Sequence, residues 1–169
     1  NSNLDDRTGC LKILYGDWND ALNGLGVSQD GSCEFGTGCS VMATLQHYKL
    51  LNEMCEILEC VGGYDKKCSE LMNIRGRIKK GLYRFAVQQD GEYRMLIHGW
   101  GDKASYTIGS LCDTDGKKRY SINPYSFWCI SEMIKQDSTF KKDILNAYDH
   151  LDSKYGLKTF DKFFPEDMK

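Results

Sequence analysis

Two acids, an amide and an indole lie side by side at residues 16–20, which read Gly-Asp-Trp-Asn-Asp. Asp17 and Asp20 are three residues apart, so a helical turn would place both on one side, where neighbouring carboxyl groups disfavour each other's charge. One of them could then stay protonated near neutral pH and act as an acid. Trp18 adds an apolar face beside hydrogen-bonding groups, which suits a sugar ring. The alternative is that either aspartate only caps the turn that follows.

The neighbouring residues indicate how this segment would be positioned. A strand-like run at residues 11–15 precedes it, and Gly16 lets the backbone turn sharply, so that the acids emerge at the edge of a core. Residues 28–35 have the composition of a long irregular loop, and such a loop in a globular chain is more often functional than idle. The sequence thus predicts a site on loops beside a strand.

Two long helices are predicted next. The first begins at residues 36–38 and ends at the glycine pair 62–63, and its apolar surface is so broad that we expect several neighbours to bury it. The second runs from about Asp65 to Gln88, where apolar residues recur at steps of three and four. Two helices joined by a glycine turn predict an antiparallel helical hairpin.

The second half of the chain mixes strands with helices. Residues 93–98, 106–111 and 119–122 have the pattern of strands, with Asp115 and Gly116 as a hairpin turn between the last two. The pattern predicts a small antiparallel β insertion near residues 93–122.

Two shorter helices are predicted after these strands. Asn123 is a common N-cap residue and Pro124 a common first helical residue, and apolar residues follow as far as Ile134. The last helix follows Ser138 and carries an apolar stripe. The predicted fold class is therefore mainly α.

Composition and charge exclude several classes of function. At 169 residues and 41% hydrophobic content the chain can form one folded domain, and its net charge of −2 gives no general attraction for nucleic acid or an anionic membrane. It has no apolar run of roughly 18 residues and no signal-peptide pattern at its start, so we expect a cytoplasmic protein that binds neither nucleic acid nor membrane. The basic run Arg75, Arg77, Lys79 and Lys80 is interpreted as a solvated helix face, because no aromatic residues alternate with it.

The cysteines and histidines do not predict a metal site. Eight cysteines occur without a C-x2-C pair, and we expect them to be reduced and structural, with Cys55 and Cys129 acting as small apolar residues in helices. His47, His98 and His150 are far apart in the sequence and form neither an H-x3-H nor an H-E-x-x-H pattern. We therefore expect no metal.

Six segments carry a likeness to a known family. They are the motif at residues 16–20, the glycine-rich loop and long helix that follow it, Asp-Gly-Glu-Tyr at 90–93, Ile-Gly-Ser at 108–110, and Ile-Asn-Pro-Tyr-Ser-Phe at 122–127. In this order they resemble glycoside hydrolase family 94, the inverting β-glycoside phosphorylases. The likeness covers roughly residues 10–165 and is most specific at residues 16–20.

The resemblance implies an (α/α)6 barrel built of helical hairpins. Members of the family are several times longer than this chain and have β domains beside the barrel, so residues 1–169 would form part of a catalytic domain. An incomplete barrel would leave apolar surface exposed on one helix layer. The remaining barrel segment or a second copy of the chain would then be a partner.

The resemblance also implies roles for single residues. Asp20 matches the family's general acid, and Trp18 matches an aromatic residue that lines the acceptor sugar site. Asp17 and Asn19 join the predicted substrate-binding set, with Asp17 orienting Asp20 or raising its pKa. Tyr125 stands where some members have a glutamine that helps to hold phosphate. The implied substrates are a β-linked glucan oligosaccharide or disaccharide and inorganic phosphate, with no further cofactor and a sugar 1-phosphate as product.

Two other functions stay open. An inverting hydrolase on the same barrel is favoured by the altered phosphate residues. A non-catalytic helical segment that binds carbohydrate or acts as a scaffold is favoured if these 169 residues are the entire protein, because a partial barrel cannot surround a substrate. Phosphate dependence separates the phosphorylase from the hydrolase, since a hydrolase releases sugar equally fast without phosphate.

Overall fold

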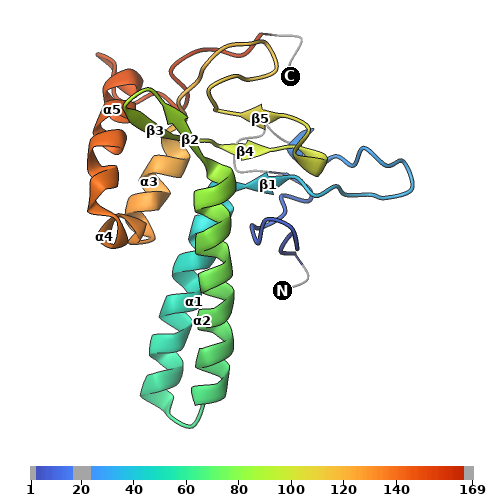
Figure 1. Cartoon of the computed structure of the whole chain (residues 1–169), viewed down its shortest axis with the longest axis vertical. Coiled ribbons are helices and arrows are strands. Elements are labelled where there is room, and N and C mark those ends of the chain that lie inside the picture. Colours follow the sequence, from blue (N-terminus) through green and yellow to red (C-terminus); the bar gives the residue numbers. More distant parts are fainter. Residues whose placement is uncertain (1–2, 17–23, 166–169) are drawn as a thin grey trace.

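A helical hairpin is the largest element of the computed structural model, which describes residues 3–16 and 24–165 (Figure 1). Its helices, α1 (Val41–Val61) and α2 (Asp65–Gly81), lie side by side and project from the rest of the molecule. The glycine pair 62–63 joins them with φ angles of 80°, a conformation that glycine adopts without strain. The predicted hairpin and its glycine turn are confirmed.

The start of α1 lies later than predicted. Cys39–Ser40 form strand β1, so the helix begins at Val41. The hydroxyl of Ser40 accepts a hydrogen bond from the amide of Ala43 at 3.2 Å, as an N-cap does. Pairing of β1 with a distant strand therefore overrides the local pattern at residues 36–38.

The end of α2 lies earlier than predicted. After Gly81 the chain widens into a π-helical turn, η2 (Leu82–Ala86), and then extends as β2 (Val87–Asp90). The apolar period continues through this change, which explains why the sequence predicted one helix as far as Gln88.

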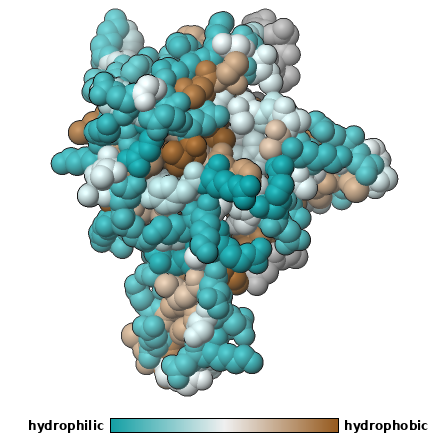
Figure 2. Space-filling view, in the orientation of Figure 1, coloured by the Kyte–Doolittle hydropathy of each residue, from teal (hydrophilic) through white to brown (hydrophobic). Residues whose placement is uncertain are grey.

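Burial along α1 decreases towards the projecting end of the hairpin. Leu45 and Leu51 are buried, whereas Leu50 and Ile57 keep 49% and 55% of their surface exposed. Apolar residues accordingly reach the surface of that end (Figure 2). The expectation that several neighbours bury the helix holds for its first half, where α2 and α3 pack against it, and fails towards Val61, where no residue after Cys55 is buried.

Two small antiparallel sheets lie at the base of the hairpin (Figure 1). One has the strand order β1-β4-β5, where β4 is Gly99–Trp100 and β5 is Thr107–Ile108. The other pairs β2 with β3 (Tyr93–Leu96). Because Cys39 pairs with Trp100 and Gly99 with Ile108, the start of α1 is tied to the middle of the chain.

Two of the predicted strands are wrong. Residues 11 and 12 form only single bridges, and Ser121 forms a single bridge with Phe160. The turn at residues 113–116 exists, closed by a hydrogen bond from the amide of Gly116 to the carbonyl of Asp113 at 2.8 Å, but it does not join two strands. Isolated backbone hydrogen bonds, such as those from Lys12 to Asn3 and from Arg119 to Ser110, hold these segments together with a few side-chain bonds instead of a strand ladder.

Shorter helices pack beside the hairpin. In chain order they are the 3-10 turn η3 (Asp102–Ala104), α3 (Ile122–Ile130), α4 (Met133–Gln136), the 3-10 turn η4 (Ser138–Phe140) and α5 (Lys141–Leu151). Trp128 on α3 stacks on Phe140 with ring centroids 4.7 Å apart, in a core that α1, α3, α5 and β3 share. Helices form in both predicted C-terminal regions, with α3 beginning one residue before Asn123, but the first predicted helix is divided into α3 and α4 because Glu132 between them has a φ of 65°.

The molecule is mainly helical with small antiparallel sheets, as predicted. All eight cysteines are free, and Cys55 is buried while Cys129 is exposed. Among the helices in residues 3–16 and 24–165, none is long and apolar enough to cross a membrane. The (α/α)6 arrangement stays a prediction.

Candidate functional site

A cavity opens at Gly16, the last described residue before the predicted acid and its neighbours. Asp17, Trp18, Asn19 and Asp20 themselves fall outside the described residues, whereas the chain on both sides of them is described. The site is therefore built from the residues that hold the two ends of this segment and from the cavity that begins at Gly16.

Close backbone contacts fix the two ends. The amide of Ile13 donates to the carbonyl of Gly38 at 2.9 Å. A Cβ on Gly26 would lie 1.9 Å from the carbonyl oxygen of Leu14, and a Cβ on Gly38 would lie equally close to that of Leu25. Only glycine permits these approaches, so the glycines bring the chain before and after the motif into direct contact.

Tyr106 supports the second end. Its hydroxyl donates to the carbonyl of Gly24 at 2.9 Å, and its ring packs beside a small cluster of Ile13, Leu25 and Ile108. Tyr106 directly precedes β5, so this strand is tied to Gly24, the first described residue after the motif. Both ends of that segment rest on the same small cluster.

Asp102 organises the irregular loop at residues 28–37. Its carboxylate accepts hydrogen bonds from the amide of Gln29 at 2.7 Å and from the amide and hydroxyl of Thr37 at 2.6 and 2.9 Å. These bonds, led by that from Gln29, lower the pKa of Asp102 to about 2. The side chain is 3% exposed, so a single buried carboxylate replaces the strand ladder that this loop lacks.

The cavity has a volume of about 550 Å³, within the roughly 300–1,000 Å³ typical of small-molecule sites. Its walls come from the segment that enters the motif, from the first turns of α1 and from the start of α3. Its lining is Leu11, Lys12, Ile13, Gly16, Ser40, Met42, Ala43, Gln46, Asn123 and Phe127. Apolar walls with a few polar groups suit a sugar, which has apolar ring faces and hydroxyl edges.

Asn123 is the unusual member of this lining. The residue is only 8% exposed, and its buried Nδ2 has no hydrogen-bond partner within the described structure. A buried amide that lacks a partner costs free energy, so such groups call for an explanation. Here the amide belongs to the wall of a cavity, where a hydroxyl of a ligand could accept its hydrogen bond.

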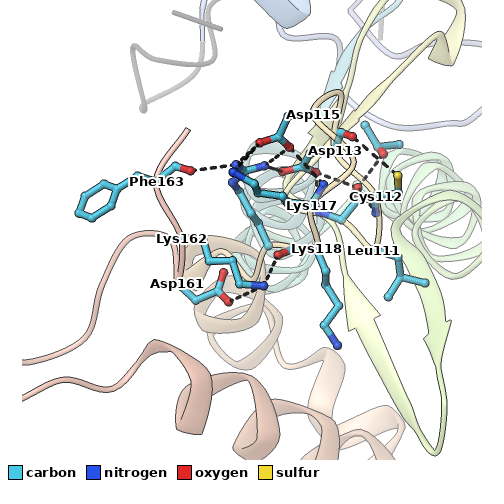
Figure 3. A network of polar contacts seen from close by, with 12 residues as sticks. Leu111, Cys112, Asp113, Asp115, Lys117, Lys118, Asp161, Lys162 and Phe163 are labelled. Atoms are coloured by element: carbon cyan, nitrogen blue, oxygen red, sulfur yellow. Dashed lines mark hydrogen bonds and ion pairs between the residues drawn. The ribbon is translucent and has the colours of Figure 1, made fainter. Parts of the chain in front are cut away.

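A network of ion pairs positions the chain that leads into α3 (Figure 3). Arg119 is fully buried and binds both carboxylate oxygens of Asp115, at 2.7 and 2.6 Å, and Asp113 at 3.2 Å. Its guanidinium also donates to the carbonyl of Phe163 at 2.8 Å. Hydrogen bonds from Arg119 hold the pKa of Asp115 below its usual range. The network thus fixes the approach to Asn123.

Tyr125 does not face the cavity. Its side chain is fully buried, and its hydroxyl accepts a hydrogen bond from the amide of Leu96 at 3.0 Å. Burial raises the pKa of this hydroxyl well above its usual range. In this chain Tyr125 therefore ties α3 to β3 and is not among the residues that line the cavity.

Two residues that matter most to this geometry, Asn123 and Asp102, have roles that the sequence does not predict. The sequence pattern predicts Asn123 as a helix cap, but the helix begins before it and its side chain lines the cavity. Asp102 belongs to no recognisable sequence motif, and the only sequence feature that marks it is that it is a single acidic residue next to a glycine in a loop. Within the described residues no group of three or more His, Cys, Asp or Glu could hold a metal ion.

Comparison with known proteins identifies the family of the chain. The family model of the Glycosyl hydrolase 94 superfamily, catalytic domain, matches residues 2–165. A relative, Solabiose phosphorylase of Paenibacillus borealis, is 27% identical over 152 residues, a match that covers 89% of this chain and 18% of the relative. The chain thus spans about a fifth of that relative's length. Because the family model matches nearly all of the chain, the protein belongs to the Glycosyl hydrolase 94 superfamily and carries sequence of its catalytic domain.

Proposed function

We propose that this chain supplies the general acid of an inverting β-glucoside phosphorylase, with Asp20 as the proton donor. Family membership and the phosphorylase relative support the class of reaction. The observation that carries the proposal is the cavity that opens at Gly16 and presents the unpartnered amide of Asn123. Gly16, the first residue of the motif and the last that is described before Asp17, lines a cavity that is large enough for a sugar.

The reaction needs one protein carboxyl group. Protonated Asp20 donates its proton to the glycosidic oxygen, the bond from that oxygen to the anomeric carbon breaks, and an oxygen of inorganic phosphate attacks the carbon from the opposite face. The products are a sugar 1-phosphate of inverted configuration and the released sugar. Phosphate replaces the water and the general base of an inverting hydrolase, so no further cofactor enters the proposal.

The neighbours of Asp20 would tune and complete this site. Asp17 disfavours a second negative charge nearby and thereby raises the pKa of Asp20, which keeps the acid protonated near neutral pH. Trp18 would stack on the acceptor sugar, and Asn19 would add hydrogen bonds. Phe127 in the cavity wall offers a second aromatic surface for the sugar.

The proposal extends to the architecture. We propose that the described helices form one part of an (α/α)6 barrel, completed by residues outside this chain or by a second copy. The exposed apolar residues at the end of the hairpin, such as Leu50 and Ile57, support incomplete burial of this kind. The length of the relative also supports it, since the match covers 18% of that protein.

Replacing the acid tests the assignment. In the enzyme that carries this chain, Asp20→Asn is expected to lower kcat by about 10²–10⁴-fold, because an amide cannot donate the proton. Sugar binding should change little, and Asp17→Asn should instead shift the pH dependence of kcat. Turnover measured by release of sugar 1-phosphate decides the matter, and near-normal phosphorolysis by Asp20→Asn would remove Asp20 from this role.

A second candidate, inverting hydrolysis, is favoured by Tyr125. Its hydroxyl is engaged with the amide of Leu96 in the core, so it does not supply the phosphate contact that a glutamine gives elsewhere in the family. Sugar release with and without inorganic phosphate separates the two reactions. Dependence on phosphate supports phosphorolysis, and equal rates would assign hydrolysis.

A further inference from the structure

A second cavity, of about 190 Å³, lies between the turn at residues 6–9 and the end of α2. Its lining includes four cations, Arg7, Arg77, Lys80 and Arg84, and one carboxylate, that of Asp6. It shares no lining residue with the cavity that opens at Gly16. The two cavities are therefore separate.

Close packing builds this second cavity. A Cβ on Gly81 would lie 1.9 Å from the carbonyl oxygen of Thr8, and one on Gly9, whose φ is 69°, would lie 3.2 Å from that of Arg77. These contacts press the N-terminal turn against α2 in a way that only glycine allows. Backbone contacts thus fix the relative position of the two segments that line the cavity.

Aromatic contacts restrain two of the cations. The guanidinium of Arg7 lies 5.7 Å and that of Arg84 5.2 Å from the centroid of the Phe85 ring. Such cation–π contacts orient a guanidinium while leaving its N–H groups free to bind an anion. Phe85 is itself part of the lining.

The structure divides the basic run of α2 between two environments. Arg75 lies over the Tyr48 ring at 4.0 Å, and Lys79 donates to the side chain of Gln136 at 2.6 Å. Arg77 and Lys80 instead line the cavity, and neither they nor Arg7 and Arg84 form an ion pair with any described residue. The interpretation of this run as a uniform solvated face holds only in part.

We propose that this cavity binds a small, multiply charged oxyanion, namely the phosphate dianion, free or as the phosphate group of a monoester. Four cations around one carboxylate repel one another, and a dianion would relieve that repulsion through charge-assisted hydrogen bonds. Arginine predominates, and its planar fork matches the geometry of phosphate oxygens. The volume lies below the roughly 300–1,000 Å³ of drug-sized sites, which favours a compact ligand.

This site goes beyond the proposed reaction. The phosphate that attacks the sugar would have to reach Asp20, whereas this cavity is lined by residues 6–9 and 77–85. We therefore expect the oxyanion to bind here without being consumed.

Titration by ¹H–¹⁵N NMR of the purified chain tests the proposal. Inorganic phosphate and glucose 1-phosphate, added separately, are expected to shift the amide signals of Gly9 and Gly81 with a saturating curve. Sodium chloride at the same ionic strength should not. Binding of either probe supports the site, and the tighter one tells whether the anion is free or a monoester.

Charge-matched variants give the control. Arg77→Gln with Arg84→Gln is expected to weaken phosphate binding at Gly9 and Gly81 at least tenfold, and Lys80→Gln alone should weaken it less. Lys66→Gln with Lys154→Gln removes the same charge elsewhere and should leave it unchanged. Equal weakening in both double variants, equal shifts with chloride, or absence of saturable shifts in the wild-type chain would each overturn the proposal.

Discussion

Asn123 and Tyr125 are two residues apart at the start of α3, and the structure gives them different environments. Asn123→Leu keeps the size of the side chain and removes an amide that has no hydrogen-bond partner among the described residues. We expect the free energy of unfolding to change little and sugar binding to weaken about tenfold, the value of one or two hydrogen bonds. Urea unfolding and a sugar titration measure the two effects. Unchanged sugar binding would contradict a role in the site.

Tyr125→Phe is the control for Asn123→Leu, because it also removes one polar group at the start of α3. It removes the hydroxyl that accepts the hydrogen bond of Leu96 and leaves a buried N–H without a partner. We expect a loss of about 1–3 kcal/mol in the free energy of unfolding, with the KM for phosphate unchanged. A raised KM for phosphate with an unchanged free energy of unfolding would instead show that Tyr125 contacts phosphate.

At the scale of elements, Asp102 holds the irregular loop beside the motif. Asp102→Asn removes a charge that accepts hydrogen bonds from Gln29 and Thr37, so we expect a loss of about 2 kcal/mol in the free energy of unfolding at pH 7. Protection of the Gln29 and Thr37 amides from hydrogen exchange should fall with it. Exchange unchanged in the variant would show that the loop is held by other contacts.

The stabilisation from Asp102 should depend on pH in a defined window. Its pKa is about 2 in the folded chain against 3.8 for an ordinary aspartate, so between these values the unfolded state binds more protons. The contribution is complete above about pH 4 and is lost as the pH falls towards 2. The difference in melting temperature between wild type and Asp102→Asn should shrink over that range, and a constant difference would contradict the assignment.

At the scale of the whole molecule, burial decides what the same substitution costs. Leu50 and Leu51 are neighbours on α1, but Leu50 is 49% exposed and Leu51 is 4% exposed. Leu51→Ala is expected to cost about 2–5 kcal/mol because it leaves a cavity, and Leu50→Ala less than about 0.5 kcal/mol. Urea unfolding of the two variants measures this contrast. Equal costs would mean that the projecting face of α1 is covered in solution.

The helical hairpin could be predicted closely, because its signals are local. A 3.6-residue apolar period and the glycine pair 62–63 act within a few residues of the backbone that they shape. The start of α1 could not, because β1 exists only through its pairing with β4, which lies far along the chain. The strands expected at residues 11–15 and 119–122 failed for a related reason, since single bridges and isolated hydrogen bonds hold both segments, with side-chain carboxylates added at 119–122.

The sequence alone determined the helical class, the hairpin and the motif at residues 16–20 that points to glycoside chemistry, because these depend on residue type and short spacing. Tertiary structure decided which residues share a cavity. It placed Asn123 in the wall near Gly16, withdrew Tyr125 into the core and divided the basic run between two environments. Such outcomes depend on packing between distant segments, which local periodicity does not encode.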